Sequence, residues 1–91
     1  MTGSGDAHGS ASLLLVDDDR LILGTLAAGL RHMGYRVAVA DSVEQAEALL
    51  GGGLHPDLAI VDVRLPGRDG LSLAQRLAEV DHVPFLMLSA Y

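Results

Sequence analysis

The stretch DLAIVDVRLPGRDG, residues 57–70, decides the fold. Its first part, residues 58–61, is a short apolar run with two β-branched residues, which is typical of a strand buried on both faces of a parallel sheet. Asp62 comes at the carboxyl end of this strand, where open α/β sheets place their ligands. Pro66 and Gly67 then interrupt regular structure, so the sequence predicts a loop soon after the acid.

A second group of acids, Asp17, Asp18 and Asp19, follows another apolar run, residues 13–16. If the two strands are neighbours, three or four carboxylates meet at one edge of the sheet. Two like charges about 4 Å apart repel by about 4 kcal/mol at an effective dielectric near 20, so such a group needs a cation, a proton or distance. Mg²⁺ suits these oxygen ligands, and the pattern suggests phosphoryl transfer with one carboxylate as nucleophile. The alternative is that Asp19 caps a helix while the other acids are solvated in loops.

Composition narrows the class of protein. The chain has 91 residues, enough for one small domain, and is 49% apolar with a formal charge of −6. Its six basic residues are all arginine and are scattered, which argues against a nucleic-acid surface within these residues. Cysteine is absent, no apolar run approaches a membrane span, and no signal-peptide pattern begins the chain. We therefore expect a cytoplasmic protein without a membrane segment.

The order of predicted elements indicates an α/β fold. Residues 1–11 are rich in glycine and serine, and we expect a disordered tail there. After the tail, apolar runs typical of strands alternate with segments of helical periodicity. The strands are expected over 12–16, 35–40, 58–61 and 85–88, and the helices over 20–33, 43–50 and 71–79. This β-α-β-α-β-α-β order predicts a doubly wound parallel sheet with helices on both faces.

The first predicted helix carries the clearest local signals. Asp19 is placed to cap its amino end. Leu23, Leu26, Leu30 and Met33 recur at spacings of three and four, which predicts that all four face the core.

The second predicted helix begins with a capping-box pattern, because Gln45 follows Ser42 by three positions. This pattern favours a capping role over a catalytic one for Asp41 and Ser42.

Taken together, four segments resemble the receiver domain of two-component response regulators. They occur in the order and spacing of that family, and the resemblance runs from about Ser12 to the last residue. The matching segments are residues 14–19, 56–62, 65–70 and 83–90. The resemblance implies a flavodoxin-like sheet with strand order 2-1-3-4-5.

The same resemblance implies roles for individual residues. Asp62 would be the phosphoacceptor, and Asp17, Asp18, Asp62 and the backbone carbonyl of Arg64 would hold Mg²⁺. Ser89 falls where the family has a hydroxyl that contacts the phosphoryl group. The implied donor is a phosphohistidine on a sensor histidine kinase, and the implied effect is to switch an output domain or partner. Such a chain is a phosphoacceptor that assists its own phosphorylation and dephosphorylation, and is not otherwise an enzyme.

One departure from the family concerns a lysine at the end of a fifth strand, because this sequence contains no lysine. We therefore expect the last helix, strand and helix of the fold to be missing, so that residues 12–91 are the N-terminal part of a receiver domain. The fourth strand, residues 85–88, would then be an exposed apolar edge, which predicts a dimer or swapped assembly through it.

Two other functions stay open at this point. The first is a phosphatase or phosphotransferase with an aspartyl nucleophile, although haloacid-dehalogenase-like enzymes need a second acid two residues after the nucleophile and Arg64 occupies that position. The second is a receiver-like module that binds proteins without being phosphorylated.

Overall fold

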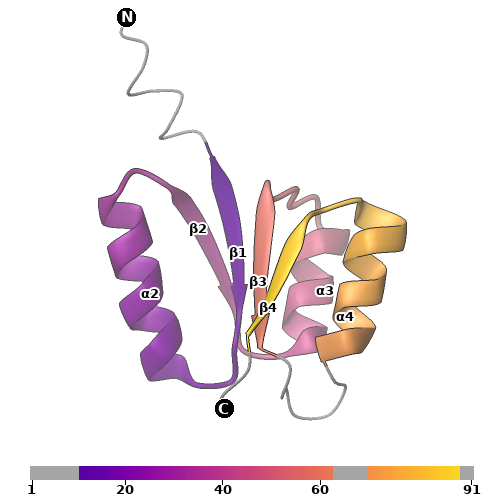
Figure 1. Ribbon diagram of the computed structural model, residues 1–91, viewed down its shortest axis with the longest axis horizontal. Coiled ribbons are helices and arrows are strands. Elements are labelled where there is room, and N and C mark those ends of the chain that lie inside the picture. The colour runs from indigo at the N-terminus through magenta and orange to yellow at the C-terminus, as the bar shows by residue number, and fades with distance from the viewer. Residues whose placement is uncertain (1–10, 63–69, 89–91) are drawn as a thin grey trace, which may run out of the picture.

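The computed structural model describes residues 11–62 and 70–88, in which strands and helices alternate (Figure 1). These residues form four strands, three α-helices and one π-helical turn. In chain order they are β1 (Ser12–Val16), α2 (Arg20–His32), β2 (Arg36–Ala40), α3 (Val43–Gly51), β3 (Leu58–Asp62), α4 (Gly70–Arg76), the π-helical turn Leu77–Asp81 and β4 (Phe85–Leu88). The predicted order of elements is confirmed. Most of the predicted tail, the loop predicted around Pro66 and Gly67, and the last three residues lie outside the described part.

The four strands form one sheet in the order β2-β1-β3-β4, and every pairing is parallel. Helix α2 lies on one face of this sheet, and α3 and α4 lie on the other (Figure 1). Each helix therefore connects two parallel strands across a face of the sheet, as the alternation of strands and helices predicted. In the described part of the chain, no helix has both the length and the apolar character needed to cross a membrane.

The two faces of the sheet are buried to different degrees. On the face covered by α3 and α4, Ala59 and Val61 of β3 are completely buried. On the opposite face, Leu58 and Ile60 are only half-buried. The predicted burial of β3 on both faces is therefore only partly right. The reason is that α2 contacts β1 and β2, and leaves much of β3 and β4 uncovered on its face.

The core-facing side of α2 also differs from the predicted one. Leu23 and Ala27 are buried against the sheet and Leu30 packs beside them. Leu26 and Met33, which were predicted to face the core, are 42% and 67% exposed. Their prediction is wrong because the helix rests on a narrow strip of β1 and β2, so that residues on its flank meet solvent.

The helix ends follow local chemistry. The side chain of Asp19 accepts hydrogen bonds from the backbone N–H groups of Leu21 and Ile22, and Ser42 Oγ accepts one from the N–H of Gln45. Both predicted caps are therefore confirmed. The third helix differs from its prediction, because it widens into the π-helical turn after Arg76 instead of continuing as an α-helix.

Candidate functional site

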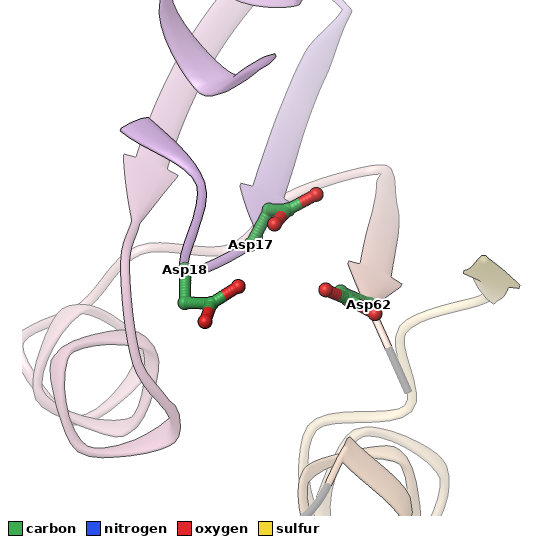
Figure 2. A group of neighbouring side chains, drawn as sticks. All are labelled: Asp17, Asp18 and Asp62. Atoms are coloured by element: carbon green, nitrogen blue, oxygen red, sulfur yellow. The ribbon is translucent and has the colours of Figure 1, made fainter. Parts of the chain in front are cut away.

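Three carboxylates meet at the carboxyl ends of the two central strands. Val16 of β1 pairs with Val61 of β3, so the next residues, Asp17 and Asp62, end the two strands at the same level. Asp18 extends from the loop between β1 and α2 toward the same space (Figure 2). One carboxylate oxygen from each of the three acids lies within 4.8 Å of the others. The predicted meeting of these three side chains is confirmed.

The loop that carries two of these acids is held by hydrogen bonds at both ends. The backbone N–H of Asp17 donates to the carbonyl of Ala40 at 3.1 Å. One carboxylate oxygen of Asp17 accepts a hydrogen bond from the N–H of Asp19 at 2.9 Å, and Asp19 itself caps α2. Asp18 is exposed, and its side chain accepts no hydrogen bond from the described residues. Asp17 is thus fixed in place, whereas Asp18 can adjust to a ligand.

The electrostatics of the site favour a proton or a cation. Burial raises the pKa of Asp17 above its ordinary value, and this effect exceeds the opposing effect of the hydrogen bond from Asp19 N–H. The negative charge of Asp62 and a hydrogen bond shared with its side chain raise that pKa further, and Asp18 adds to it. Bringing the acids together therefore costs free energy, which a bound cation would offset.

The donor set fits a hard divalent ion. Magnesium binds oxygen ligands at about 2.0–2.1 Å, so two oxygens on opposite sides of one ion are about 4.2 Å apart. The upper limit of 4.8 Å on the separations between the three carboxylate oxygens is close to that value, and the exposed Asp18 side chain is free to adjust to an ion. Mg²⁺ usually takes one or two protein carboxylates directly and keeps several waters, so Asp18 suits contact through water.

Two residues predicted for this site, Arg64 and Ser89, lie outside the described part of the chain. Their implied roles, and those of the three acids as metal ligands and phosphoacceptor, stay predictions. One polar contact beside the site was missed by the sequence analysis. Arg20, the first residue of α2, forms an ion pair with Asp41 after β2 at 2.9 Å. No spacing pattern signals this pair, because the two residues are 21 positions apart.

Comparison with known proteins agrees with this geometry. Residues 13–91 match the family described as the response regulator receiver domain. The chain is 42% identical over 79 residues to the transcriptional regulatory protein AfsQ1 of Streptomyces coelicolor, covering 87% of this chain and 35% of AfsQ1. It is 36% identical over 91 residues to the transcriptional regulatory protein PdtaR of Mycobacterium tuberculosis, covering 99% of this chain and 44% of PdtaR. The chain thus spans between a third and a half of these two relatives.

Solved structures show the same fold. The non-phosphorylated HemR receiver domain from Leptospira biflexa is 35% identical with a TM-score of 0.79, and the match covers 89% of this chain and 65% of that one. The response regulator TrrA from Thermotoga maritima, solved in complex with Mg²⁺ and BeF, is 29% identical with a TM-score of 0.79. That match covers 90% of this chain and 71% of that one. The sequence match and the shared architecture lead to one conclusion: the chain belongs to the response regulator receiver family.

Proposed function

We propose that this chain receives a phosphoryl group on Asp62 from a phosphohistidine of a sensor histidine kinase, with Mg²⁺ held by Asp17, Asp18 and Asp62. The observation that carries the proposal is the meeting of the three carboxylates within 4.8 Å at the ends of β1 and β3. The Mg²⁺ and BeF complex of TrrA, a protein with the same architecture, supports it. Because the donor is a kinase of the two-component type, we place the chain in the cytoplasm.

The chemistry of transfer follows from the position of Asp62. One of its carboxylate oxygens attacks the phosphorus atom in line with the leaving imidazole nitrogen. The phosphorus–nitrogen bond breaks, its electron pair stays on the imidazole, and the product is an aspartyl phosphate. Asp62 attacks as the ionised carboxylate, which is the nucleophilic form of this side chain.

A bound Mg²⁺ would neutralise charge on the transferring phosphoryl oxygens. Asp17 is suited to direct coordination because its backbone and side chain are both fixed by hydrogen bonds. Arg64 and Ser89 are included in the proposal through their positions in the family's motifs: the Arg64 carbonyl as a further metal ligand and the Ser89 hydroxyl as a phosphoryl contact. The consequence of phosphorylation would be a changed surface presented to an output domain or partner.

Incubation with acetyl phosphate and Mg²⁺, followed by intact-protein mass spectrometry, tests the proposal. We expect a mass gain of one phosphoryl group that is lost in Asp62→Asn and on chelation of the metal. The matched control is Asp57→Asn, which removes the same group just before the opposite end of the same strand and should retain phosphorylation. Circular dichroism of each variant establishes that it is folded.

The other outcomes separate the competing functions. Steady release of phosphate from phosphate esters would overturn the proposal in favour of an aspartyl phosphatase or phosphotransferase. Mg²⁺ binding with no mass gain from acetyl phosphate or from a phosphorylated kinase would favour a protein-binding module that is not phosphorylated.

A further inference from the structure

We infer that Arg20 and Asp41 are positioning residues that fasten the acidic loop after β1 to the start of α3, and so set the arrangement of Asp17 and Asp18 for a divalent ion. This inference rests on the proposed metal site and adds two residues that do not touch the ion. Arg20 is two positions after Asp18, and Asp41 directly follows β2.

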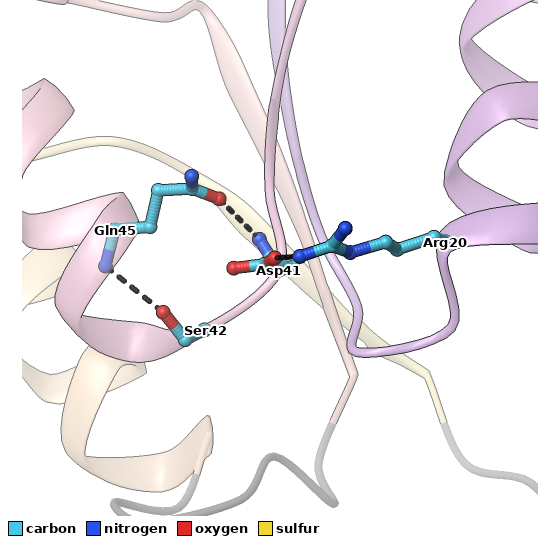
Figure 3. A network of polar contacts seen from close by, with 4 residues as sticks. All are labelled: Arg20, Asp41, Ser42 and Gln45. Carbon is cyan, nitrogen blue, oxygen red and sulfur yellow. Dashed lines mark hydrogen bonds and ion pairs between the residues drawn. The ribbon is translucent and has the colours of Figure 1, made fainter.

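The first observation is the contact itself. The Arg20 guanidinium donates to the Asp41 carboxylate at 2.9 Å and bridges the space between α2 and the loop after β2 (Figure 3). A second bond joins the same two loops, since the N–H of Asp17 donates to the carbonyl of Ala40, the residue before Asp41. The acidic loop is therefore tied to its neighbour on both sides of Asp18.

The second observation is that the backbone of Asp41 is held in place by hydrogen bonds at the start of α3. Its backbone N–H donates to the Gln45 side-chain oxygen at 2.6 Å, while the Gln45 N–H donates to Ser42 Oγ at 3.1 Å (Figure 3). Ser42 thus caps α3, and the Gln45 side chain reaches one residue beyond this cap, to the N–H of Asp41, so both bonds hold the chain at the first turn of α3. Arg20 thus bonds to a carboxylate whose backbone is held by the helix start, and movement of the acidic loop would have to break that contact.

The size of the effect is limited by solvent. The side chain of Arg20 is 84% exposed and that of Asp41 is 29% exposed, so water screens the ion pair. Exposed pairs contribute modestly, and we expect loss of this one to weaken metal binding by about two- to fivefold.

The direction of the effect separates positioning from simple charge. If only the electric field mattered, Arg20→Gln would strengthen binding of a cation by removing a positive charge, and Asp41→Asn would weaken it by removing a negative one. If the pair positions the loop, both substitutions weaken binding. The charge-exchanged double variant, Arg20→Asp with Asp41→Arg, should then recover most of the lost affinity.

The experiment measures Mg²⁺ affinity of the 91-residue chain by isothermal titration calorimetry for the wild type, both single variants and the exchanged pair. Amide hydrogen exchange of the metal-free chain provides a second readout. The N–H of Asp19, which donates to Asp17, should exchange about two- to fivefold faster in each single variant, as expected for an exposed ion pair. The matched control for affinity is Arg31→Gln, which makes the same charge change near the far end of α2 and should leave the Mg²⁺ affinity unchanged.

Each result has one meaning. Opposite shifts in affinity for the two single variants, or no change in affinity and exchange, would overturn the inference. A wild-type chain that binds no Mg²⁺ would overturn the proposed metal site instead, and the exchange of the Asp19 amide would still decide whether the ion pair fastens the loop.

Discussion

The two outer strands of the sheet, β2 and β4, differ in the side chains that lie along their free edges. In β2, the residues on either side of Val37 bond to β1, so the Val37 carbonyl points away from the sheet. Arg31 of α2 donates to this carbonyl at 2.8 Å. Arg36 adds an exposed positive charge to the same strand. One arginine therefore satisfies an outward-pointing carbonyl of β2, and a second arginine adds a charge to this strand.

Among the residues that the structure describes, the β4 edge differs from the β2 edge. By the same alternation, the backbone groups of Phe85 and Met87 point away from β3, because the N–H of Ala59 bonds to the carbonyl of Pro84. Strand β4 contains no charged residue, and Leu86 and Leu88 are 54% and 43% exposed. An apolar edge with outward-pointing backbone groups is suited to pairing with another strand.

The difference shows that the side chains beside an edge strand decide whether its backbone is blocked from pairing with another strand or available for it. Strand β2 lies beside a helix whose last turns supply an arginine, whereas β4 itself contains no charged residue. In the described part of the chain, β4 is therefore the edge where association is expected to begin.

The largest expected effect tests association through β4. We expect the 91-residue chain to self-associate, and Leu86→Lys to weaken this association by at least about tenfold, because a charge on an edge strand opposes pairing. Sedimentation velocity over a range of concentrations measures the effect. The matched control is Val39→Lys on β2, which should not alter association although Val39 is 38% exposed. A monomeric wild type, or equal effects of the two lysines, would contradict the comparison.

The next effect concerns the hydrogen bond from Arg31 to the edge of β2. Arg31→Ala removes the donor to the Val37 carbonyl and should lower the free energy of unfolding by about 1 kcal/mol, the usual net value of one hydrogen bond. Urea denaturation measures this loss. Arg31→Lys, which keeps a charged donor, should recover part of it, and a full loss with lysine would show that the alkyl packing matters more than the bond.

A smaller effect is expected at the turn that leads into β4. His82 has a φ of 54°, a left-handed conformation that costs free energy for residues with a Cβ atom. His82→Gly should raise the free energy of unfolding by about 0.5 kcal/mol, because relief of this cost exceeds the added flexibility of the unfolded chain. His82→Ala serves as the control in thermal denaturation, and it should give no gain.

The smallest expected effect is a pH dependence of stability that comes from the acids at the ends of the inner strands and not from the outer strands. The folded-state pKa of Asp17 is raised above the ordinary value of 3.8, so between these two values the folded chain binds more protons than the unfolded chain. The metal-free chain should therefore gain stability as pH falls from neutral through the raised pKa, and this gain is complete below 3.8. Asp17→Asn should flatten the slope in urea titrations at several pH values. Leu86→Lys should keep the wild-type slope, since the acids lie at strand ends and not along the β4 edge.

Much of the architecture could be predicted because it depends on local patterns. Apolar runs and the caps at Asp19 and Ser42 depend on neighbouring residues, and the parallel order of strands follows from their alternation with helices. That order also predicts that Asp17 and Asp62 meet at one edge of the sheet if their strands are neighbours, and the pairing of β1 with β3 meets this condition.

The rest depends on tertiary packing. A spacing of three and four residues fits two overlapping sides of a helix, and only the position of α2 on the sheet decides that Leu23 is buried while Leu26 is exposed. The Arg20 and Asp41 contact needs two loops to be brought together, which no local pattern encodes. The π-helical turn after Arg76 likewise has no recognised signal in the sequence.

The pairing of Val16 with Val61 has a consequence for folding. Because side chains alternate between faces, a slip of one residue between β1 and β3 would turn either Asp17 or Asp62 to the wrong side. A mispaired sheet would then lack the complete set of three acids, and a divalent ion that binds all three would not stabilise it. Magnesium binding would thus stabilise only those chains in which β1 and β3 are paired in the correct register.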